Sequence, residues 1–347
     1  TARASKPSPN VFAALKAITG LALIILGVAV GTSEHHAAAL VVDGQVVAAA
    51  EEERFNRVKH YGYKLAAQTG GNLINTPGLS VDDVFCDLAS DYVLRAAGLS
   101  LADVDYIAVN ALPSWLLDTG RACVVEGRYV YVPHHLSHAA LAARTSPHWV
   151  DHVLTVDGRG EFETAALFAQ TSSGDLTRTA ELPAGEGRSI GGAFETVTRV
   201  IGLGAHGQGQ TMALAAFEGG DPAAFPEAYA IEGFDAYQLD EMRLQRVAQS
   251  RLDAARDPRR ERRRLAADVQ AATERALIAL AAEAGAAPQA GWAIAGGVAL
   301  NCCANSKLRD AVGGDLWVPS AAHDAGTALG AALEAAQATS GRPKRPL

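Results

Sequence analysis

Cysteine is scarce in this sequence, with four residues, Cys86, Cys123, Cys302 and Cys303, among 347. No two of them form a CxxC pair and their spacing gives no framework, so we expect no disulfides and a reducing, cytoplasmic compartment. Charged residues are also few, at 20% of the chain. The acidic residues outnumber the basic ones, which gives a net charge of −8. A chain without a basic excess is not expected to bind nucleic acid.

One long hydrophobic segment, Val11 to Gly31, is a candidate for a membrane-spanning helix. Lys16 is its only charged residue. It is nearly long enough to span a bilayer. However, Gly20 and Gly31 are expected to interrupt a helix here, and the residues that follow predict a β-hairpin rather than the polar flank of a membrane-spanning helix. The sequence therefore predicts a short helix and a strand here, and no membrane partner. The segment also lacks a charged leader and a convincing cleavage site, so we expect no export.

Apolar residues are plentiful, at 49%, and a length of 347 residues exceeds what one hydrophobic core usually organises. The segments "LALIILGVAVG", "AAALVVDG" and "QVVAAAEEER" predict three strands with an Asp-Gly turn between the last two. A similar pattern recurs in "HVLTVDGRGEFETAALFAQ". Helical segments alternate with these strands, which predicts a duplicated α/β unit. Residues 240–286 are predicted to be helical, with the arginine run 259–264 on a solvated face.

The stretch "VPHHLSHAALAA" places three histidines within five positions of an apolar run. A helix is predicted from Leu136 onward, with Pro133 just ahead of its first turn. Positions i and i+4 share a helix face, so His134 and His138 can converge, whereas His135 points elsewhere. Two imidazoles on one face make half of a transition-metal site. The alternative is a pair of hydrogen-bonded histidines at the start of a helix.

Two later segments carry residues that suit a ligand site. The segment "GWAIAGGVALNCCANSKLRDA" predicts a strand that ends at Gly296 and Gly297 and leads into a helix, where backbone amides can approach a phosphate. A tight connection without a ligand explains the same pattern. Further on, Asp324 begins a helix of small residues. It is a candidate for the third metal ligand, and equally a helix cap.

Five motifs in this order resemble those of the O-carbamoyltransferase family, which includes the nodulation-factor, cephamycin, novobiocin and tobramycin carbamoyltransferases. They are "HHLSHAA", "VLTVDGRGEFET", "GQGQTMALAA", "AGGVALNCCAN" and "SAAHDAGTALGAAL". The resemblance extends from about residue 26 to residue 335. It implies an actin-like ATPase, ribonuclease H-like fold of two similar α/β lobes with mixed sheets flanked by helices. It also implies kinship with the transferase that makes threonylcarbamoyl-adenosine in tRNA.

The resemblance implies functional roles for individual residues. A metal, commonly iron(II), would be held by His134, His138 and Asp324. The nucleotide would be contacted by Gly158, Gly160, Gly296, Gly297 and Asn301. Asp157 and Glu161 would lie close to the transfer centre, although turn formation and surface charge also explain them. His135 or Asp157 could act as the general base.

The chemistry that the resemblance implies has two stages. Carbamoyl phosphate and ATP, with Mg²⁺ as a companion of the nucleotide, first give carbamoyl-adenylate. A hydroxyl of a small-molecule acceptor, an antibiotic or other secondary metabolite, then attacks the activated carbonyl. Two other functions on this fold are retained as alternatives: a nucleotide-binding module without full activity, and a kinase or tRNA threonylcarbamoyl transferase-like enzyme.

Some features depart from the family pattern. Glu34, His35 and His36 stand where family members usually carry a His-Asp pair, and Gln210 stands where a lysine is common. Residues 60–80 look unlike the family's usual helix and could shape the acceptor pocket. The family also has a YrdC-like C-terminal domain that forms the adenylate, which is absent from these 347 residues, so a separate YrdC-like domain or protein is an expected partner.

From the resemblance we expect four consecutive regions. They are an N-terminal extension at 1–25, a first lobe at 26–150, a second lobe at 151–335 with a helical insertion at about 236–286, and a tail or linker at 336–347.

Overall fold

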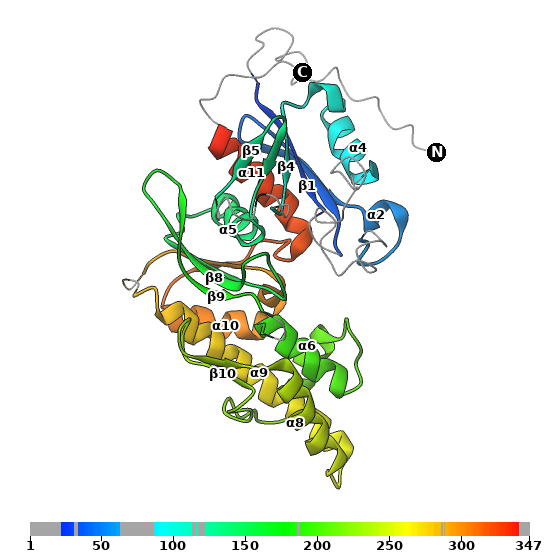
Figure 1. The fold of residues 1–347 in the computed structure, drawn as a ribbon, viewed down its shortest axis with the longest axis vertical. Helices are drawn as coiled ribbons and strands as arrows, with labels where there is room; N and C mark the ends of the chain where they lie inside the picture. The colour runs from blue at the N-terminus through cyan, green and yellow to red at the C-terminus, as the bar shows by residue number, and fades with distance from the viewer. Residues whose placement is uncertain are drawn as a thin grey trace. The chain divides into compact units, whose positions relative to one another are not determined.

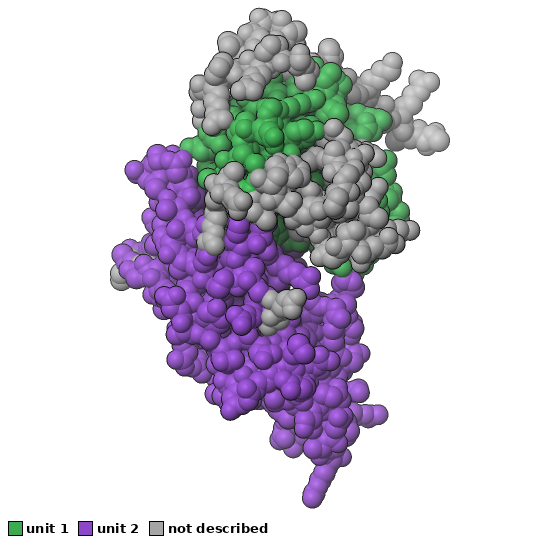
Figure 2. All heavy atoms as spheres, viewed as in Figure 1, with its two compact units in different colours: residues 1–144, 324–347 green, residues 145–323 purple. Residues whose placement is uncertain are grey.

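The computed structural model describes residues 22–30, 34–62, 87–112, 116, 122–185, 188–285, 287 and 289–339. The chain divides into two compact units, which are coloured separately in Figure 2. Unit 1 takes its residues from 1–144 and 324–347, and unit 2 from 145–323. Residues 60–80 lie largely outside the described part of the chain, as does Cys86, so the expectations about them stay predictions.

Unit 1 is built on a six-stranded mixed sheet with the order β3-β2-β1-β4-β6-β5. β1 to β3 pair antiparallel, β4 pairs parallel with both β1 and β6, and β5 pairs antiparallel with β6. Every residue of β1 and β2 is buried, as apolar strands at the centre of a sheet should be. The strands are β1 (Ile24–Ala29), β2 (Ala37–Val42), β3 (Gln45–Glu51), β4 (Tyr106–Val109), β5 (Val124–Glu126) and β6 (Tyr129–Tyr131).

The turn between β2 and β3 confirms a prediction made from two residues. Asp43 has φ 51° and Gly44 has φ 76°, so both central residues adopt the left-handed conformation. That is the geometry of a two-residue type I′ hairpin, which an Asp-Gly pair favours because glycine adopts positive φ without strain. The hairpin fixes which faces of β2 and β3 point into the core.

Helices flank this sheet, as Figure 1 shows for α4 and α11. α4 packs against β2 and β3, whereas α11 packs against β1, β2 and β4. α5 begins at His134, two residues earlier than predicted, directly after Pro133. The helical segments of unit 1 are α2 (Glu53–Asn56), α4 (Asp87–Ala96), η3 (Leu101–Asp103), α5 (His134–Thr145), η6 (Asp324–Gly326) and α11 (Thr327–Thr339).

Glycines bring α11 close to its neighbours. A Cβ added at Gly27 of β1 would lie 2.0 Å from the carbonyl oxygen of Ala328, and one added at Gly330 would lie 1.9 Å from the carbonyl oxygen of Ser137 on α5. Backbone therefore packs directly against backbone at both places. This close packing holds the start of α11 beside the start of α5.

Unit 2 repeats the topology of unit 1. Its five-stranded sheet has the order β13-β12-β7-β8-β9, with β7 to β9 antiparallel and β12 parallel to both β7 and β13. An antiparallel meander followed by parallel strands thus occurs twice, as the repeated sequence pattern predicts. The strands are β7 (His152–Val156), β8 (Glu163–Gln170), β9 (Leu176–Pro183), β12 (Trp292–Ala295) and β13 (Leu316–Trp317), and a separate hairpin consists of β10 (Tyr229–Ile231) and β11 (Tyr237–Leu239).

The helices of unit 2 bury a core that α9 dominates. Asp257 caps α9 by accepting hydrogen bonds from the N–H groups of Arg259 and Arg260, and Pro258 occupies its first turn. Most of the arginine run 259–264 is exposed, as predicted for a solvated face. The helical segments are α6 (Ile190–Val200), α7 (Gln208–Ala215), α8 (Glu241–Asp253), α9 (Pro258–Ala282), η5 (Gly297–Leu300) and α10 (Cys302–Val312).

The division into units differs from the expected order of consecutive lobes. Residues 324–335 were expected in the second lobe, but they belong to unit 1, because α11 packs on the first sheet. The first boundary lies at 144/145 rather than 150/151. Within the described residues, no helix is both long enough and apolar enough to cross a membrane.

Candidate functional site

α5 presents two histidines on one buried face. His134 and His138 are 3% and 0% exposed, and their rings stand perpendicular with centroids 4.7 Å apart. This is the convergence that the i, i+4 spacing predicts. Burying two imidazoles side by side is costly unless their nitrogens have polar partners. The pair therefore requires a polar group opposite it.

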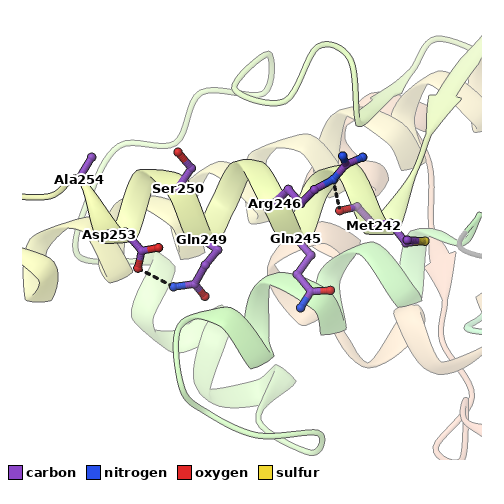
Figure 3. A pocket seen from close by; sticks show the side chains of 7 residues that line it. All are labelled: Met242, Gln245, Arg246, Gln249, Ser250, Asp253 and Ala254. Carbon is purple, nitrogen blue, oxygen red and sulfur yellow. Dashed lines mark hydrogen bonds between the residues drawn. The ribbon is translucent and has the colours of Figure 1, made fainter.

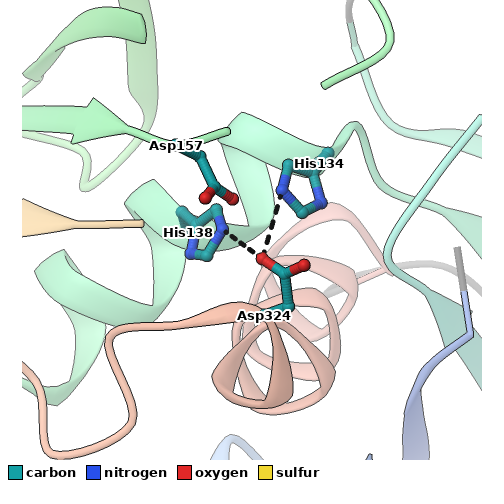
Figure 4. A group of neighbouring side chains, drawn as sticks. All are labelled: His134, His138, Asp157 and Asp324. Atoms are coloured by element: carbon teal, nitrogen blue, oxygen red, sulfur yellow. Dashed lines mark ion pairs between the residues drawn. The ribbon is translucent and has the colours of Figure 1, made fainter. Parts of the chain in front are cut away.

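Asp324 supplies that polar group (Figure 4). Its Oδ1 lies 3.6 Å from His134 Nε2 and 3.4 Å from His138 Nε2, and its side chain is 20% exposed. The carboxylate sits in η6, directly before α11. Asn110 at the end of β4 donates a hydrogen bond of 2.8 Å to Thr327 Oγ1, and Thr327 in turn donates to the carbonyl of Asp324. These bonds fix the segment that carries the carboxylate.

The three side chains fit a transition metal. Metal–nitrogen and metal–oxygen distances near 2.1 Å place neighbouring ligands of a tetrahedral ion about 3.4 Å apart. The two observed nitrogen–oxygen distances, 3.6 Å and 3.4 Å, agree with that spacing. Imidazole and carboxylate are also the donors of two-histidine, one-carboxylate iron sites. His134, His138 and Asp324 are therefore brought together as a candidate metal centre within unit 1.

His135 lies next to this group. It is 1% exposed, and its ring centroid is 5.6 Å from that of His134 and 6.2 Å from that of His138. The structure thus places His135 beside the candidate metal ligands.

In unit 2, Asp157 connects the two glycine turns that were candidates for nucleotide contact. It follows β7 and is 8% exposed; Figure 4 also draws it. Its Oδ1 accepts hydrogen bonds from Gly158 N at 2.7 Å and from Gly297 N at 3.1 Å. Because β7 and β12 are parallel neighbours, the segments that follow them emerge at the same edge of the sheet. One carboxylate oxygen therefore ties both turns together.

The turn after β12 depends on small residues. Gly296 has φ 97°, and a Cβ added there would lie 2.2 Å from the carbonyl oxygen of Val156. A Cβ added at Gly297 would lie 2.9 Å from Asp157 Oδ1. Asn301 follows as the N-cap of α10, where its Oδ1 accepts a hydrogen bond from Ala304 N at 3.0 Å. Three of the five predicted nucleotide-contacting residues thus lie in one short connection.

The remaining candidates lie in the connection between β7 and β8. Gly158 has nothing within 4 Å of an added Cβ, so open space faces that position. Gly160 and Glu161 follow in the same connection and are partly buried. Their predicted roles in nucleotide contact and in the transfer centre stay predictions.

Ser189 and Glu241 belong to the same part of unit 2, and the sequence did not single them out. Ser189 caps α6, accepting from Gly192 N at 2.8 Å while its own Oγ donates to the carbonyl of Asp157 at 3.3 Å. Glu241 accepts from Ser189 N at 3.1 Å. Burial raises the pKa of the Glu241 carboxyl, which outweighs the lowering effects of that hydrogen bond and of Arg159. A serine followed by "IGG" is a helix-start signal that could have located this support.

One of the residues that depart from the family pattern, His35, lies in a polar group of unit 1. His35 has φ 62°, and its ring centroid lies 4.9 Å from that of His60. His60 N donates a 2.6 Å hydrogen bond to Glu53 Oε2. Burial raises the pKa of Glu53, but this hydrogen bond and the nearby positive charges outweigh it, so the net shift is downward. In unit 2, Gln210 lies exposed in the first turn of α7.

One hollow on the surface involves none of these residues. It is lined by side chains of α8 and the residue after it (Figure 3): Met242, Gln245, Arg246, Gln249, Ser250, Asp253 and Ala254. A hollow lined by one helix has no second wall to enclose a small molecule, so its shape does not suit a catalytic site.

Comparisons with known proteins identify the family and the fold of this chain. Residues 117–333, more than half of the chain, match the family model described as Carbamoyltransferase N-terminus. The chain is 32% identical to nodulation protein NolNO of Sinorhizobium fredii (strain NBRC 101917 / NGR234) over 319 residues, 86% of this chain and 45% of that protein. It spans about half the length of the curated relatives it matches.

Two solved structures share the fold. Component A of (R)-2-hydroxyglutaryl-CoA dehydratase from Acidaminococcus fermentans has a TM-score of 0.56 and 17% identity, covering 92% of this chain and 99% of that one. Full-length HypF, in a phosphate- and nucleotide-bound form, has a TM-score of 0.51 and 15% identity, covering 92% of this chain and 47% of that one. The predicted actin-like ATPase fold is confirmed. The family model shows that this chain belongs to the carbamoyltransferase family.

Proposed function

We propose that this chain is the transfer domain of an ATP-dependent O-carbamoyltransferase. It would move a carbamoyl group from carbamoyl phosphate, through carbamoyl-adenylate, to a hydroxyl of a small molecule such as an antibiotic or another secondary metabolite. The observation that carries the proposal is the convergence of His134, His138 and Asp324 within the segment that matches the family model. Fold alone would not suffice, because actin-like folds host many functions.

The candidate metal centre would hold iron(II) through His134, His138 and Asp324. When bound, such an ion supplies charge neutralisation for phosphate oxygens and polarisation of the carbamoyl carbonyl. The chain's own contribution is to hold the three donors in place without solvent competition, because both imidazoles are buried. Mg²⁺ would accompany ATP as it does in other nucleotide sites.

The turns after β7 and β12 would bind the nucleotide, through Gly158, Gly160, Gly296, Gly297 and Asn301. Because glycine has no side chain, a ligand can approach the backbone of both turns closely. The hydrogen bonds from Gly158 N and Gly297 N to one oxygen of Asp157 support this role, because they hold both turns in a fixed relation before a ligand arrives.

In the transfer step, the acceptor oxygen would attack the carbamoyl carbon and form the carbamate C–O bond. The bond from that carbon to the adenylate phosphate oxygen breaks, and AMP leaves with the electron pair. The hydroxyl proton passes to a base, for which His135 and Asp157 are the two candidates, with Glu161 close to the transfer centre. A neutral imidazole or a carboxylate within hydrogen-bond reach can take such a proton.

A nucleotide-binding module without transferase activity is the second candidate. It is favoured by the exposed amide of Gln210 in α7, at a position where the family commonly places a lysine. An amide cannot provide the charge-assisted hydrogen bond that a lysine gives to phosphate. This candidate predicts ATP binding without carbamate formation under any condition.

Carbamate formation, measured by mass spectrometry over a panel of hydroxyl acceptors, tests the proposal. The chain would be supplied either with preformed carbamoyl-adenylate or with ATP, carbamoyl phosphate and an added YrdC-like domain. We expect product in both arms, and loss of product for Asp157→Asn if it is the base, with Asp253→Asn on exposed α8 as the control. ATP binding without product in either arm would favour the binding module. Sustained turnover from ATP and carbamoyl phosphate without the added domain would show that this chain makes its own adenylate or uses carbamoyl phosphate directly.

A further inference from the structure

The side chain of Asn301 is held by a second amide that comes from a different helix. Gln270 on α9 donates from Nε2 to Asn301 Oδ1 at 3.0 Å, and Asn301 donates from Nδ2 to Gln270 Oε1 at 2.7 Å. The two amides therefore form a reciprocal pair. Asn301 Oδ1 also accepts from Ala304 N as the cap of α10, so its oxygen already has two donors.

Gln270 has no freedom to turn its amide over. It is 6% exposed, and its Nε2 also donates to Glu274 Oε1 at 2.8 Å. A primary amide carries two N–H donors, and both are used here, one on Glu274 and one on Asn301. Rotating the amide by 180° would set its oxygen against two other acceptor oxygens. The carboxylate of Glu274 thus fixes Gln270, and Gln270 fixes Asn301.

One donor of Asn301 is left over by this arrangement. Its Nδ2 has two hydrogens, and the bond to Gln270 uses one. Within the described residues, no acceptor is recorded for the other hydrogen. Asn301 is only partly buried and stands four residues after Gly297, in the connection that follows β12. A fixed amide with one remaining N–H next to small-residue backbone is suited to donate to a ligand oxygen or nitrogen.

We propose that Gln270 is a positioning residue for nucleotide binding: through its reciprocal amide pair it orients Asn301 so that the remaining N–H donates to an acceptor atom of the adenine nucleotide. The inference rests on the proposed function, in that it takes the turn after β12 to be a nucleotide site. Gln270 itself need not touch the nucleotide. Its contribution is that the donor is oriented before binding, which lowers the entropic cost of forming the contact.

Isothermal titration of the full chain with Mg²⁺-ATP tests the inference. Gln270→Met keeps the volume of the side chain but removes its hydrogen bonds, and Asn301→Asp keeps a capping oxygen but removes the N–H donor. A net hydrogen bond of about 1.4 kcal/mol corresponds to a tenfold change in Kd, so we expect each variant to bind ATP about tenfold more weakly. If Gln270→Met does not fold, Gln270→Ala replaces it.

A double-mutant cycle separates positioning from a purely structural role. If Gln270 acts through Asn301, adding Gln270→Met to Asn301→Asp should cause no further loss of affinity. Independent, additive losses would overturn the inference, as would an unchanged Kd for Gln270→Met. Gln249→Met on exposed α8 is the matched control, because Gln249 Nε2 makes the same i, i+4 bond to the carboxylate of Asp253 without any link to Asn301.

Gly297→Val distinguishes failure of this inference from failure of the proposed function. If folded Gly297→Val and Asn301→Asp both bind ATP like the unchanged chain, the nucleotide site itself is misplaced and the inference falls with it. If both lose affinity while Gln270→Met keeps it, the nucleotide site stands and only the positioning role is refuted. Thermal unfolding of each variant confirms that changes in Kd are read from folded protein.

Discussion

Replacing His138 by alanine removes one of the three donors of the candidate metal centre. In the unchanged chain we expect about one transition-metal ion per molecule, most readily iron(II), because the donor spacing matches a single ion. Alanine carries no donor atom, so the variant keeps only His134 and Asp324 of the three proposed ligands. His138→Ala should therefore lose the ion during purification, as measured by elemental analysis.

The size of the effect on stability follows from linkage between binding and folding. A ligand that binds only the folded state stabilises it by RT ln(1 + [L]/Kd), which is about 2.7 kcal/mol when the free metal is at 100 times its Kd. Removing a residue that only hydrogen-bonds to a metal ligand weakens metal binding by about 10- to 100-fold. Removing a ligand itself should therefore weaken metal binding by at least about 100-fold. At the same metal concentration the stabilisation would then fall to about 0.4 kcal/mol or less.

Chemical denaturation with and without added iron(II), under anaerobic conditions, measures this difference. The unchanged chain should gain about 2.7 kcal/mol and His138→Ala almost nothing, while His148→Ala, which replaces an exposed histidine, should behave like the unchanged chain. His138→Ala protein that retains one ion per chain and the full stabilisation would refute the assignment. Equal losses in His148→Ala would show that the variants act through something other than the ligand set.

Three other substitutions test separate parts of the structure. Gly297→Val should abolish ATP binding in calorimetry, since even a Cβ there lies 2.9 Å from Asp157 Oδ1. Gly330→Ala should destabilise the fold by about 1–3 kcal/mol and weaken metal retention, because its Cβ would meet the carbonyl of Ser137. Burial raises the pKa of the Glu241 carboxyl in the folded protein, so the folded state loses stability as the pH rises through that pKa. Glu241→Gln should therefore become more stable relative to the unchanged chain over the same pH range, as measured by unfolding at several pH values. A stability difference that does not change with pH would contradict this.

The parts of the fold that could be predicted are those that depend on residues close together in the sequence. The Asp43-Gly44 hairpin, the buried strands around it and the i, i+4 histidine pair each depend on residues close in the chain. The helices α6 and α7 and the short hairpin of β5 and β6 were not identified. Three-residue strands such as β5 and β6 give too few positions for a period of two to be recognised.

The third metal donor could not be derived from local pattern. Asp324 was a candidate by residue type, and the resemblance to a family selected it over a helix cap. What fixes it in place is the bond from Asn110 to Thr327, which spans 217 residues, and the backbone packing of Gly27 against Ala328. Contacts at such separations depend on the tertiary fold, and no periodicity in a single sequence encodes them.

The duplicated topology explains where the candidate residues occur along the chain. His134 follows β6, Asp157 follows β7 and Gly296 follows β12, and each of these strands has a parallel neighbour. In α/β sheets the loops at the carboxyl ends of parallel strands carry ligand sites, because the strands themselves are committed to the core and the helices that follow begin with unpaired N–H groups. Each repeat offers such loops: in unit 1 they carry the two histidines proposed as metal ligands, and in unit 2 they carry the small-residue turns proposed to bind the nucleotide.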